Sequence, residues 1–96
     1  MILEVAVLNV ITGKSDEFEH TFTAAQKIIS GMTGYVKHEL QRCIENPDQY
    51  ILLVSWETLE DHTVGFRNSE EYLQWKALLH HFYDPFPKVE HYISVF

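Results

Sequence analysis

The segment of residues 2–11 (ILEVAVLNVI) is apolar at both series of alternating positions, and this feature limits the possible folds most strongly. Side chains along a strand point alternately to its two faces. The two series are Leu3, Val5, Val7 and Ile11 on one face and Ile2, Ala6, Leu8 and Val10 on the other. Such a strand has to be covered on both sides, so it belongs at the centre of a sheet. Residues 50–57 (YILLVSWE) share the pattern, which predicts a sheet with two central strands.

Helical periodicity is found in two other parts of the chain. Apolar residues recur at steps of three and four through residues 16–30, which predicts an amphipathic helix with Ser15 as its N-cap. A short helix is expected from Thr58 to about Phe66, and a further helix is expected after Ser69, another N-cap. The apolar face of this last helix consists of Tyr72, Trp75, Leu79 and Phe82.

The order of the predicted elements defines the fold class. Residues 34–44 form a polar strand that suits a sheet edge, and residues 89–96 form the last strand. The resulting βαββαβ order is typical of an α+β, ferredoxin-like fold with a four-stranded antiparallel sheet. A right-handed crossover and a hairpin place the strands at 2–11 and 50–57 in the middle. The 96 residues suit a single domain, 1–96.

An apolar face remains uncovered in this arrangement. Two helices can cover only one face of the sheet, and the other face is apolar as well. Monomeric proteins rarely expose an apolar patch of that size. We therefore expect a homodimer in which two copies pack sheet against sheet.

Composition and charge exclude several classes of function. The net charge is −7 and the seven basic residues are scattered, which argues against nucleic-acid and anionic-membrane partners. The chain has no apolar run long enough to span a membrane and no signal-peptide pattern, so a cytoplasmic protein is expected. The histidines have no recognised metal-ligand spacing, and no phosphate-binding glycine loop is present. We expect neither a metal nor another cofactor.

Two runs resemble the antibiotic-biosynthesis-monooxygenase family, namely WETLEDHTVGFRNSEEYLQW at 56–75 and PFPKVEHY at 85–92. The resemblance covers nearly the whole chain. It implies a dimeric α+β barrel of two ferredoxin-like sheets, with a pocket between helices and sheet in each subunit. Some members of the family oxidise polycyclic quinols without metal or flavin. Others degrade haem or act on reactive signalling quinones.

The residues of the haem-degrading branch are matched only in part. That branch has an Asn on the first strand, and Asn9 matches it. Phe66 stands where the branch has Trp, and Lys76 stands where it has the iron-ligating His. In the quinol-oxidising branch, an Asn, a Trp and a Tyr on this same segment line the pocket. At the corresponding positions this chain has His62, Phe66 and Tyr72. Only the Tyr is kept.

The candidate site combines a base, an orienting amide and aromatic walls. His62 is the expected catalytic base, because a neutral imidazole can accept a proton from an acidic phenol. The alternative for His62 is a surface pair with a carboxylate. Asn9 is expected to orient the substrate, or else to bond neighbouring backbone. The expected substrate-binding residues, some of which could equally be plain core, are Phe66, Tyr72, Trp75, His80 and His91. Arg67 is expected to bind a carboxylate such as Glu60 or Glu90.

Three functional hypotheses follow. The first is a cofactor-independent monooxygenase that acts on a small aromatic or quinol substrate, in which the substrate itself reduces dioxygen. The second is a non-catalytic binding or stress-related module that uses the same pocket for a small hydrophobic ligand. The third is a haem-binding or haem-degrading protein.

Overall fold

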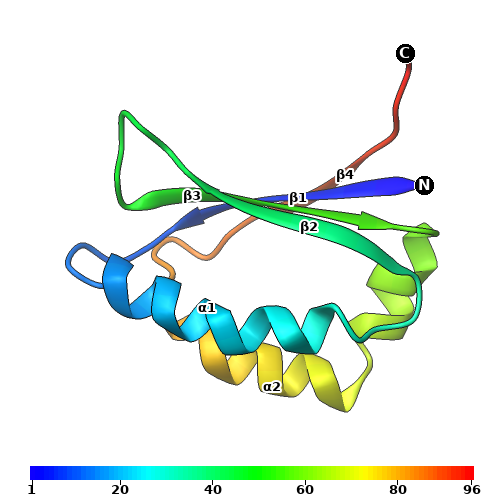
Figure 1. Ribbon diagram of the computed structural model, residues 1–96, viewed down its shortest axis with the longest axis horizontal. Helices are drawn as coiled ribbons and strands as arrows, with labels where there is room; N and C mark the ends of the chain where they lie inside the picture. The colour runs from blue at the N-terminus through cyan, green and yellow to red at the C-terminus, as the bar shows by residue number, and fades with distance from the viewer.

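The computed structural model describes residues 1–96 and contains the predicted order of elements (Figure 1). The elements are β1 (Ile2–Asn9), α1 (Ser15–Ile29), β2 (Tyr35–Arg42), β3 (Gln49–Trp56), the π-helix η1 (Asp61–Phe66), α2 (Glu70–Leu79), the 3₁₀-helix η2 (His80–Phe82) and β4 (Val89–Tyr92). The four antiparallel strands are ordered β2-β3-β1-β4. The predicted ferredoxin-like α+β fold, with β1 and β3 in the centre, is confirmed.

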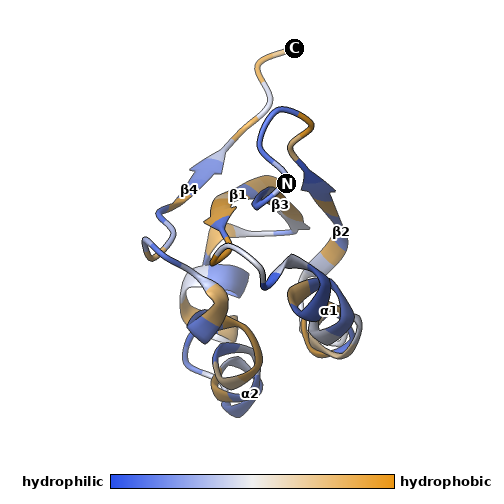
Figure 2. Cartoon of the chain, turned by 90° about the vertical axis from the view of Figure 1, so that its left-hand side faces the viewer, coloured by the Kyte–Doolittle hydropathy of each residue, from blue (hydrophilic) through white to orange (hydrophobic).

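Both long helices lie on one side of the sheet (Figure 2). The even-numbered residues of β1 face them, so that Ala6 and Leu8 are buried against the apolar stripe of α1. This stripe consists of the residues whose spacing predicted the helix, namely Phe18, Phe22, Ala25 and Ile29. Burial of such stripes is the main source of stability in a small domain. None of the helices combines the length and apolar character needed to cross a membrane.

The opposite face of the sheet is open and apolar at its centre. Val7 on β1 is 39% exposed, and its neighbours Ile51 and Leu53 on β3 are half-buried. The last residues of the chain run away from the body on this side (Figure 1), and their apolar side chains are exposed at Ile93, Val95 and Phe96. The prediction of a second apolar face is therefore confirmed, and we refer to it as the open face.

Several local predictions differ from the structure. Ser15 does not cap α1, because its hydroxyl donates instead to Asp48 Oδ1 at 2.9 Å. The last strand ends at Tyr92, which pairs with Leu3 of β1, and not at 96. The Ser69 cap is confirmed, with its oxygen accepting from the Tyr72 N–H at 3.1 Å.

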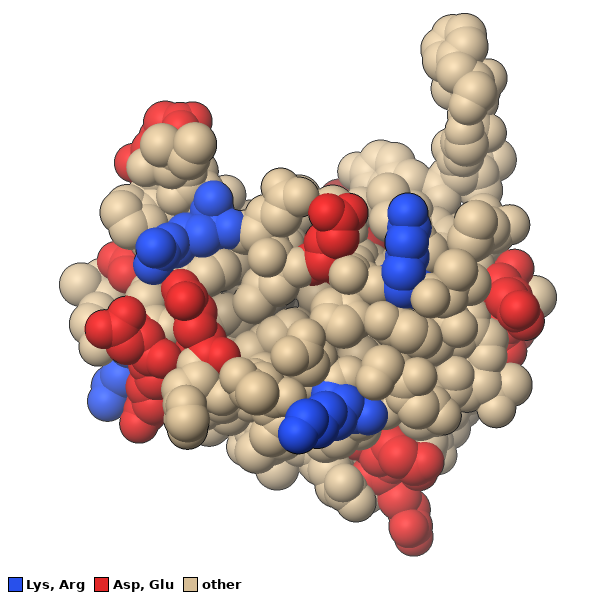
Figure 3. Space-filling view, in the orientation of Figure 1, with Lys and Arg blue, Asp and Glu red and all other residues tan.

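Charged side chains are interspersed over the surface. In the view of Figure 3, lysines and arginines alternate with carboxylates and form no continuous basic patch. One surface ion pair joins Arg42 to Glu19 at 3.1 Å, and a second joins Lys88 to Glu90 at 3.6 Å. The scattered basic residues seen in the sequence thus remain scattered on this face.

Two glycines provide a stability test of the segment that positions η1. Gly34 and Gly13 both have positive φ angles, of 83° and 88°. A Cβ at Gly34 would overlap the side chain of Asp61 at the start of η1, whereas one at Gly13 would meet nothing within 4 Å. We expect Gly13→Ala to lower the free energy of unfolding by about 1 kcal/mol and Gly34→Ala by roughly 3 kcal/mol, because the second adds overlap to backbone strain. Urea denaturation measures both, and equal losses would contradict the predicted contact.

Candidate active site

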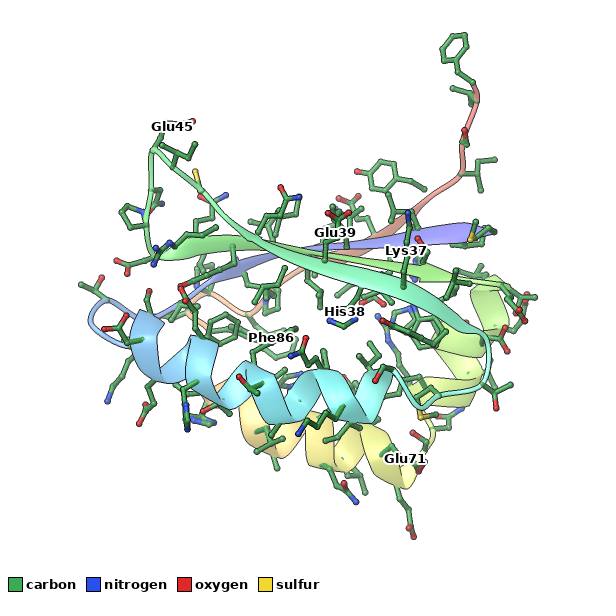
Figure 4. All side chains as sticks on the ribbon, in the orientation of Figure 1. Lys37, His38, Glu39, Glu45, Glu71 and Phe86 are labelled. Atoms are coloured by element: carbon green, nitrogen blue, oxygen red, sulfur yellow. The ribbon has the colours of Figure 1, made fainter.

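A cavity of about 420 Å³ lies between the helix-facing side of the sheet and the segments η1, α2 and 83–89. In Figure 4, Phe86 of the last segment appears at the level between sheet and helices. The aromatic lining of the cavity consists of Phe66, Tyr72, Trp75, Tyr83 and Phe86. Cavities of this volume with mainly apolar walls and a few polar groups are typical small-molecule sites.

Phe66 forms the centre of the aromatic wall. Its ring lies 5.3 Å from Tyr72 at 85° and 5.8 Å from Trp75 at 78°, both edge-to-face arrangements. Phe66 is also only 1% exposed, so its position is fixed by packing. These contacts give the cavity rigid, flat sides suited to an aromatic ligand.

The π-helix η1 determines how His62 and Phe66 are presented. The N–H of Arg67 bonds to the carbonyl of His62 at 3.1 Å, one residue further along than an α-helix allows. The wider turn buries both His62 and Phe66 against the sheet. π-helical turns of this kind are frequent at functional sites. The short helix predicted here is confirmed in place, and the Thr58 hydroxyl accepts from the Asp61 N–H as expected.

A buried polar network lies at one end of the cavity. Glu4 is 6% exposed, and its Oε1 accepts a hydrogen bond from Trp56 Nε1 at 2.9 Å. His62, 2% exposed, places Nε2 at 3.3 Å from the same oxygen and Nδ1 at 2.8 Å from His91 Nε2. Four segments therefore meet in this network, which we call the Glu4 cluster: Glu4, Trp56, His62 and His91. No buried polar side-chain atom lacks a partner.

Burial changes the protonation of this cluster. It raises the pKa of Glu4 to about 6, even though the Trp56 hydrogen bond and the charge of Arg67 act in the lowering direction. Burial lowers the pKa of His62, and the positive charges of Arg67 and protonated His91 add to this effect. Around neutral pH, Glu4 is thus mainly a carboxylate and His62 a neutral imidazole.

The contacts of the His62 ring lie within the cluster. Its Nε2 lies 3.3 Å from Glu4 Oε1, and its Nδ1 forms a hydrogen bond with His91 Nε2 at 2.8 Å. Both nitrogens of His62 therefore have a partner in the cluster close by. Glu4 and His62 both line the cavity, and the Glu4 carboxylate carries a second oxygen. The carboxylate is thus a candidate base, and His62 lies beside it.

The cavity brings most of the predicted site residues together. Its lining includes His62, Phe66, Tyr72, Trp75 and His80. His91 lies behind His62 and bonds to it, outside the lining. Asn9 does not join them, because strand alternation points it to the open face, opposite to Ala6 and Leu8.

Sequence reasoning missed two polar lining residues. Glu4 interrupts an apolar strand in the series that contains Ala6 and Leu8, and a carboxylate at such a position signals a buried site. Arg67 was expected to bind Glu60 or Glu90, and this prediction is wrong. The three ion pairs of the protein do not include Arg67, which lines the cavity instead. The residues present no group of three or more side chains suited to hold a metal ion.

The fold and this cavity define a ferredoxin-like α+β protein with a pocket between helices and sheet. The model of the antibiotic biosynthesis monooxygenase family matches residues 1–78. The chain therefore belongs to the antibiotic biosynthesis monooxygenase family. The resemblance noted from residues 56–75 and 85–92 is confirmed.

Three similar proteins match this chain over nearly its full length. The uncharacterized protein YczJ of Bacillus subtilis is 57% identical over 95 residues, which span 99% of this chain and 100% of that protein. The crystal structure of a putative antibiotic biosynthesis monooxygenase from Bordetella bronchiseptica is 33% identical, with a TM-score of 0.94 over 99% of this chain and 97% of that one. SnoaB of Streptomyces nogalater, a cofactor-independent oxygenase, shares the fold at 19% identity and a TM-score of 0.76, over 97% and 91% of the two chains.

The raised pKa of Glu4 predicts a pH-dependent stability. Between its ordinary value of 4.5 and about 6, the folded protein binds more protons at Glu4 than the unfolded chain does. The contribution of Glu4 therefore decreases by about 2 kcal/mol as pH rises through this window. The shift of His62 acts in the opposite direction, but it is present in wild type and in Glu4→Gln alike. Urea denaturation from pH 4 to 7 should show the difference between the two proteins change by this amount, and a constant difference would contradict the burial effect.

Proposed function

We propose that this protein is a monooxygenase that acts on a small hydroxylated aromatic, such as a quinol, without a metal or an organic cofactor. The observation that carries the proposal is the Glu4 carboxylate, which stands at one end of an aromatic-walled cavity with a pKa of about 6. A general base is most effective when its pKa is close to the working pH. The class of reaction is supported by membership of the antibiotic biosynthesis monooxygenase family and by the shared fold with SnoaB, which is described as a cofactor-independent oxygenase.

Proton transfer begins the proposed reaction. A substrate hydroxyl next to Glu4 gives its proton to the carboxylate, which leaves an electron-rich anion between the aromatic walls. Trp56 holds the carboxylate in place through its hydrogen bond, and His62 Nε2 lies 3.3 Å from the same oxygen. The contribution of both residues is positional, because they contact Glu4.

Oxygen is then reduced by the substrate itself. The anion passes one electron to dioxygen, and the resulting radical pair combines at a ring carbon to form a hydroperoxide, which takes its proton from Glu4. Loss of water leaves a carbonyl at that carbon. A quinol and dioxygen thus give a hydroxyquinone and water, and all four electrons come from the quinol. The protein supplies a base, a fixed orientation and exclusion of water.

Oxygen uptake with quinols tests this function. We expect Glu4→Gln to lower kcat by roughly 10²- to 10⁴-fold, because Gln keeps the hydrogen bond from Trp56 but accepts no proton. His62→Gln should lower kcat less and shift the pH profile, since it removes a group that orients the base. His81→Gln is the matched control, because His81 is exposed and does not line the cavity.

Isotope labelling distinguishes this function from its alternatives. With ¹⁸O₂, one labelled atom should enter the product and the other should appear in water. Thermal stabilisation by a ligand without oxygen uptake would contradict the oxygenase function and favour a binding module. A Soret band at stoichiometric haem would favour haem binding, for which His80 is a cavity-lining imidazole with no side-chain hydrogen bond.

We also propose that the protein works as a homodimer joined through the open face, as the dimeric barrel of the family implies. The open face contains the side chains of Val7, Ile51 and Leu53. The C-terminal segment runs out on the same side of the sheet (Figure 1), with exposed apolar side chains at Ile93, Val95 and Phe96. A sheet that covers this surface removes apolar area from water on both copies, at roughly 25 cal/mol per Å².

Sedimentation tests the dimer. The wild type should sediment at twice the chain mass of 11.3 kDa. Val7→Glu places a charge at the centre of the open face and should shift the protein toward the monomer. Leu73→Glu on α2, where the leucine is 62% exposed, is the control and should leave the mass unchanged. A stable wild-type monomer at micromolar concentration would contradict the proposed assembly.

A further inference from the structure

The two arginines of the chain differ in their surroundings. Arg42 on β2 forms an ion pair with Glu19 of α1. Arg67 forms no ion pair and no side-chain hydrogen bond, although the protein as a whole carries seven excess negative charges. The side chain of Arg67 is exposed and has no carboxylate partner, so its guanidinium is available to a ligand.

The main chain of Arg67 is held beside the Glu4 cluster, while its side chain is exposed. It follows η1 directly, and its N–H bonds to the carbonyl of His62. Arg67 lines the cavity and is the only lysine or arginine that does so. Its charge also lowers the pKa of Glu4, His62 and His91, so the guanidinium acts on all three. The positive charge of Arg67 therefore acts on the titratable groups of the Glu4 cluster.

We propose that the cavity binds an aromatic ligand that bears a single carboxylate and that Arg67 holds this carboxylate. The inference rests on the proposed function insofar as it takes the same cavity as the substrate site. The guanidinium fork matches a planar carboxylate through two parallel hydrogen bonds. Arg67 is the only cation in the lining, so it can neutralise one negative charge, whereas the second charge of a phosphate would have no cation and would add to the repulsion from Glu4.

The arrangement also places the carboxylate close to the reacting hydroxyl. The main chain of Arg67 bonds to His62, whose ring contacts Glu4, so Arg67 and Glu4 line the same end of the cavity, and the ligand should carry its acid group beside its hydroxyl. Once the ligand carboxylate neutralises Arg67, the charge that lowers the pKa of Glu4 is cancelled. The pKa of Glu4 then rises toward neutrality, which makes the carboxylate a stronger base in the complex than in the free protein.

Calorimetric titration with an isosteric pair of probes tests the ligand class. The probes are 1-hydroxy-2-naphthoate and 1-hydroxy-2-naphthamide, which share shape and hydroxyl but differ in charge. We expect the wild type to bind the carboxylate roughly ten- to hundredfold more tightly than the amide, the range for a charge-assisted pair. Titration without oxygen keeps turnover out of the measurement.

Three variants separate the role of Arg67 from general electrostatics. Arg67→Gln should abolish the preference for the carboxylate and leave binding of the amide unchanged. Arg67→Lys should keep part of the preference, because it retains the charge without the fork. Arg42→Gln removes the other arginine and should behave as wild type. As a second readout, ¹³C NMR of the Glu4 carboxyl should show its pKa rise on binding of the naphthoate but not of the naphthamide.

The outcomes distinguish this inference from the proposed function. Equal affinity for both probes, or a preference that persists in Arg67→Gln, overturns the assignment of Arg67. Absence of binding by either probe overturns it as well. In each of these cases, Glu4-dependent oxygen uptake with neutral quinols would still support the oxygenase. If the protein takes up no oxygen but still prefers the carboxylate probe, the proposed oxygenase function is contradicted and the proposed ligand class is supported.

Discussion

The burial of Glu4 in the central strand is the constraint on which the site depends. A carboxylate in the interior is tolerated only where donors compensate for lost hydration. Trp56 on β3 donates to Glu4, His62 on η1 contacts the same oxygen at 3.3 Å, and His91 on β4 bonds to His62 from the other side. The same contacts that make Glu4 tolerable thus join β1 to three other segments. Catalytic geometry and folding are coupled here, because the cluster is complete only when the sheet and η1 are assembled.

The overall architecture could be predicted from the sequence because it depends on periodicity. Alternating apolar residues identified β1 and β3, and steps of three and four identified α1, since these patterns report which side of an element faces a core. Details that depend on competing partners could not be predicted. Ser15 had a distant alternative in Asp48, which no local pattern reveals. The π-helical turn at His62 likewise results from tertiary packing and not from propensity.

The candidate site was predictable where it follows the inward faces of helices. The residues predicted on η1 and α2 do line the cavity, namely His62, Phe66, Tyr72 and Trp75. Asn9 and Glu4 are both polar residues within the apolar strand β1, but they point to opposite faces of it. Deciding between them requires knowledge of which face the helices cover. The position of Arg67 in the cavity lining could not be predicted, because the contacts of a long flexible side chain depend on the tertiary structure around it.

The two faces of β1 connect assembly to chemistry. The strand carries Glu4 toward the cavity and Leu3 and Val5 toward the open face, with neighbouring residues pointing in opposite directions. Water at the open face therefore lies one strand thickness from the base. In the proposed dimer, a second sheet removes that water and lowers the dielectric around the backbone of β1, which strengthens the interactions of Glu4 with Trp56 and Arg67. Pairing would then act on the pKa of the base without contributing a residue to the cavity, and a monomeric variant would differ from wild type in its pH profile before it differed in its fold.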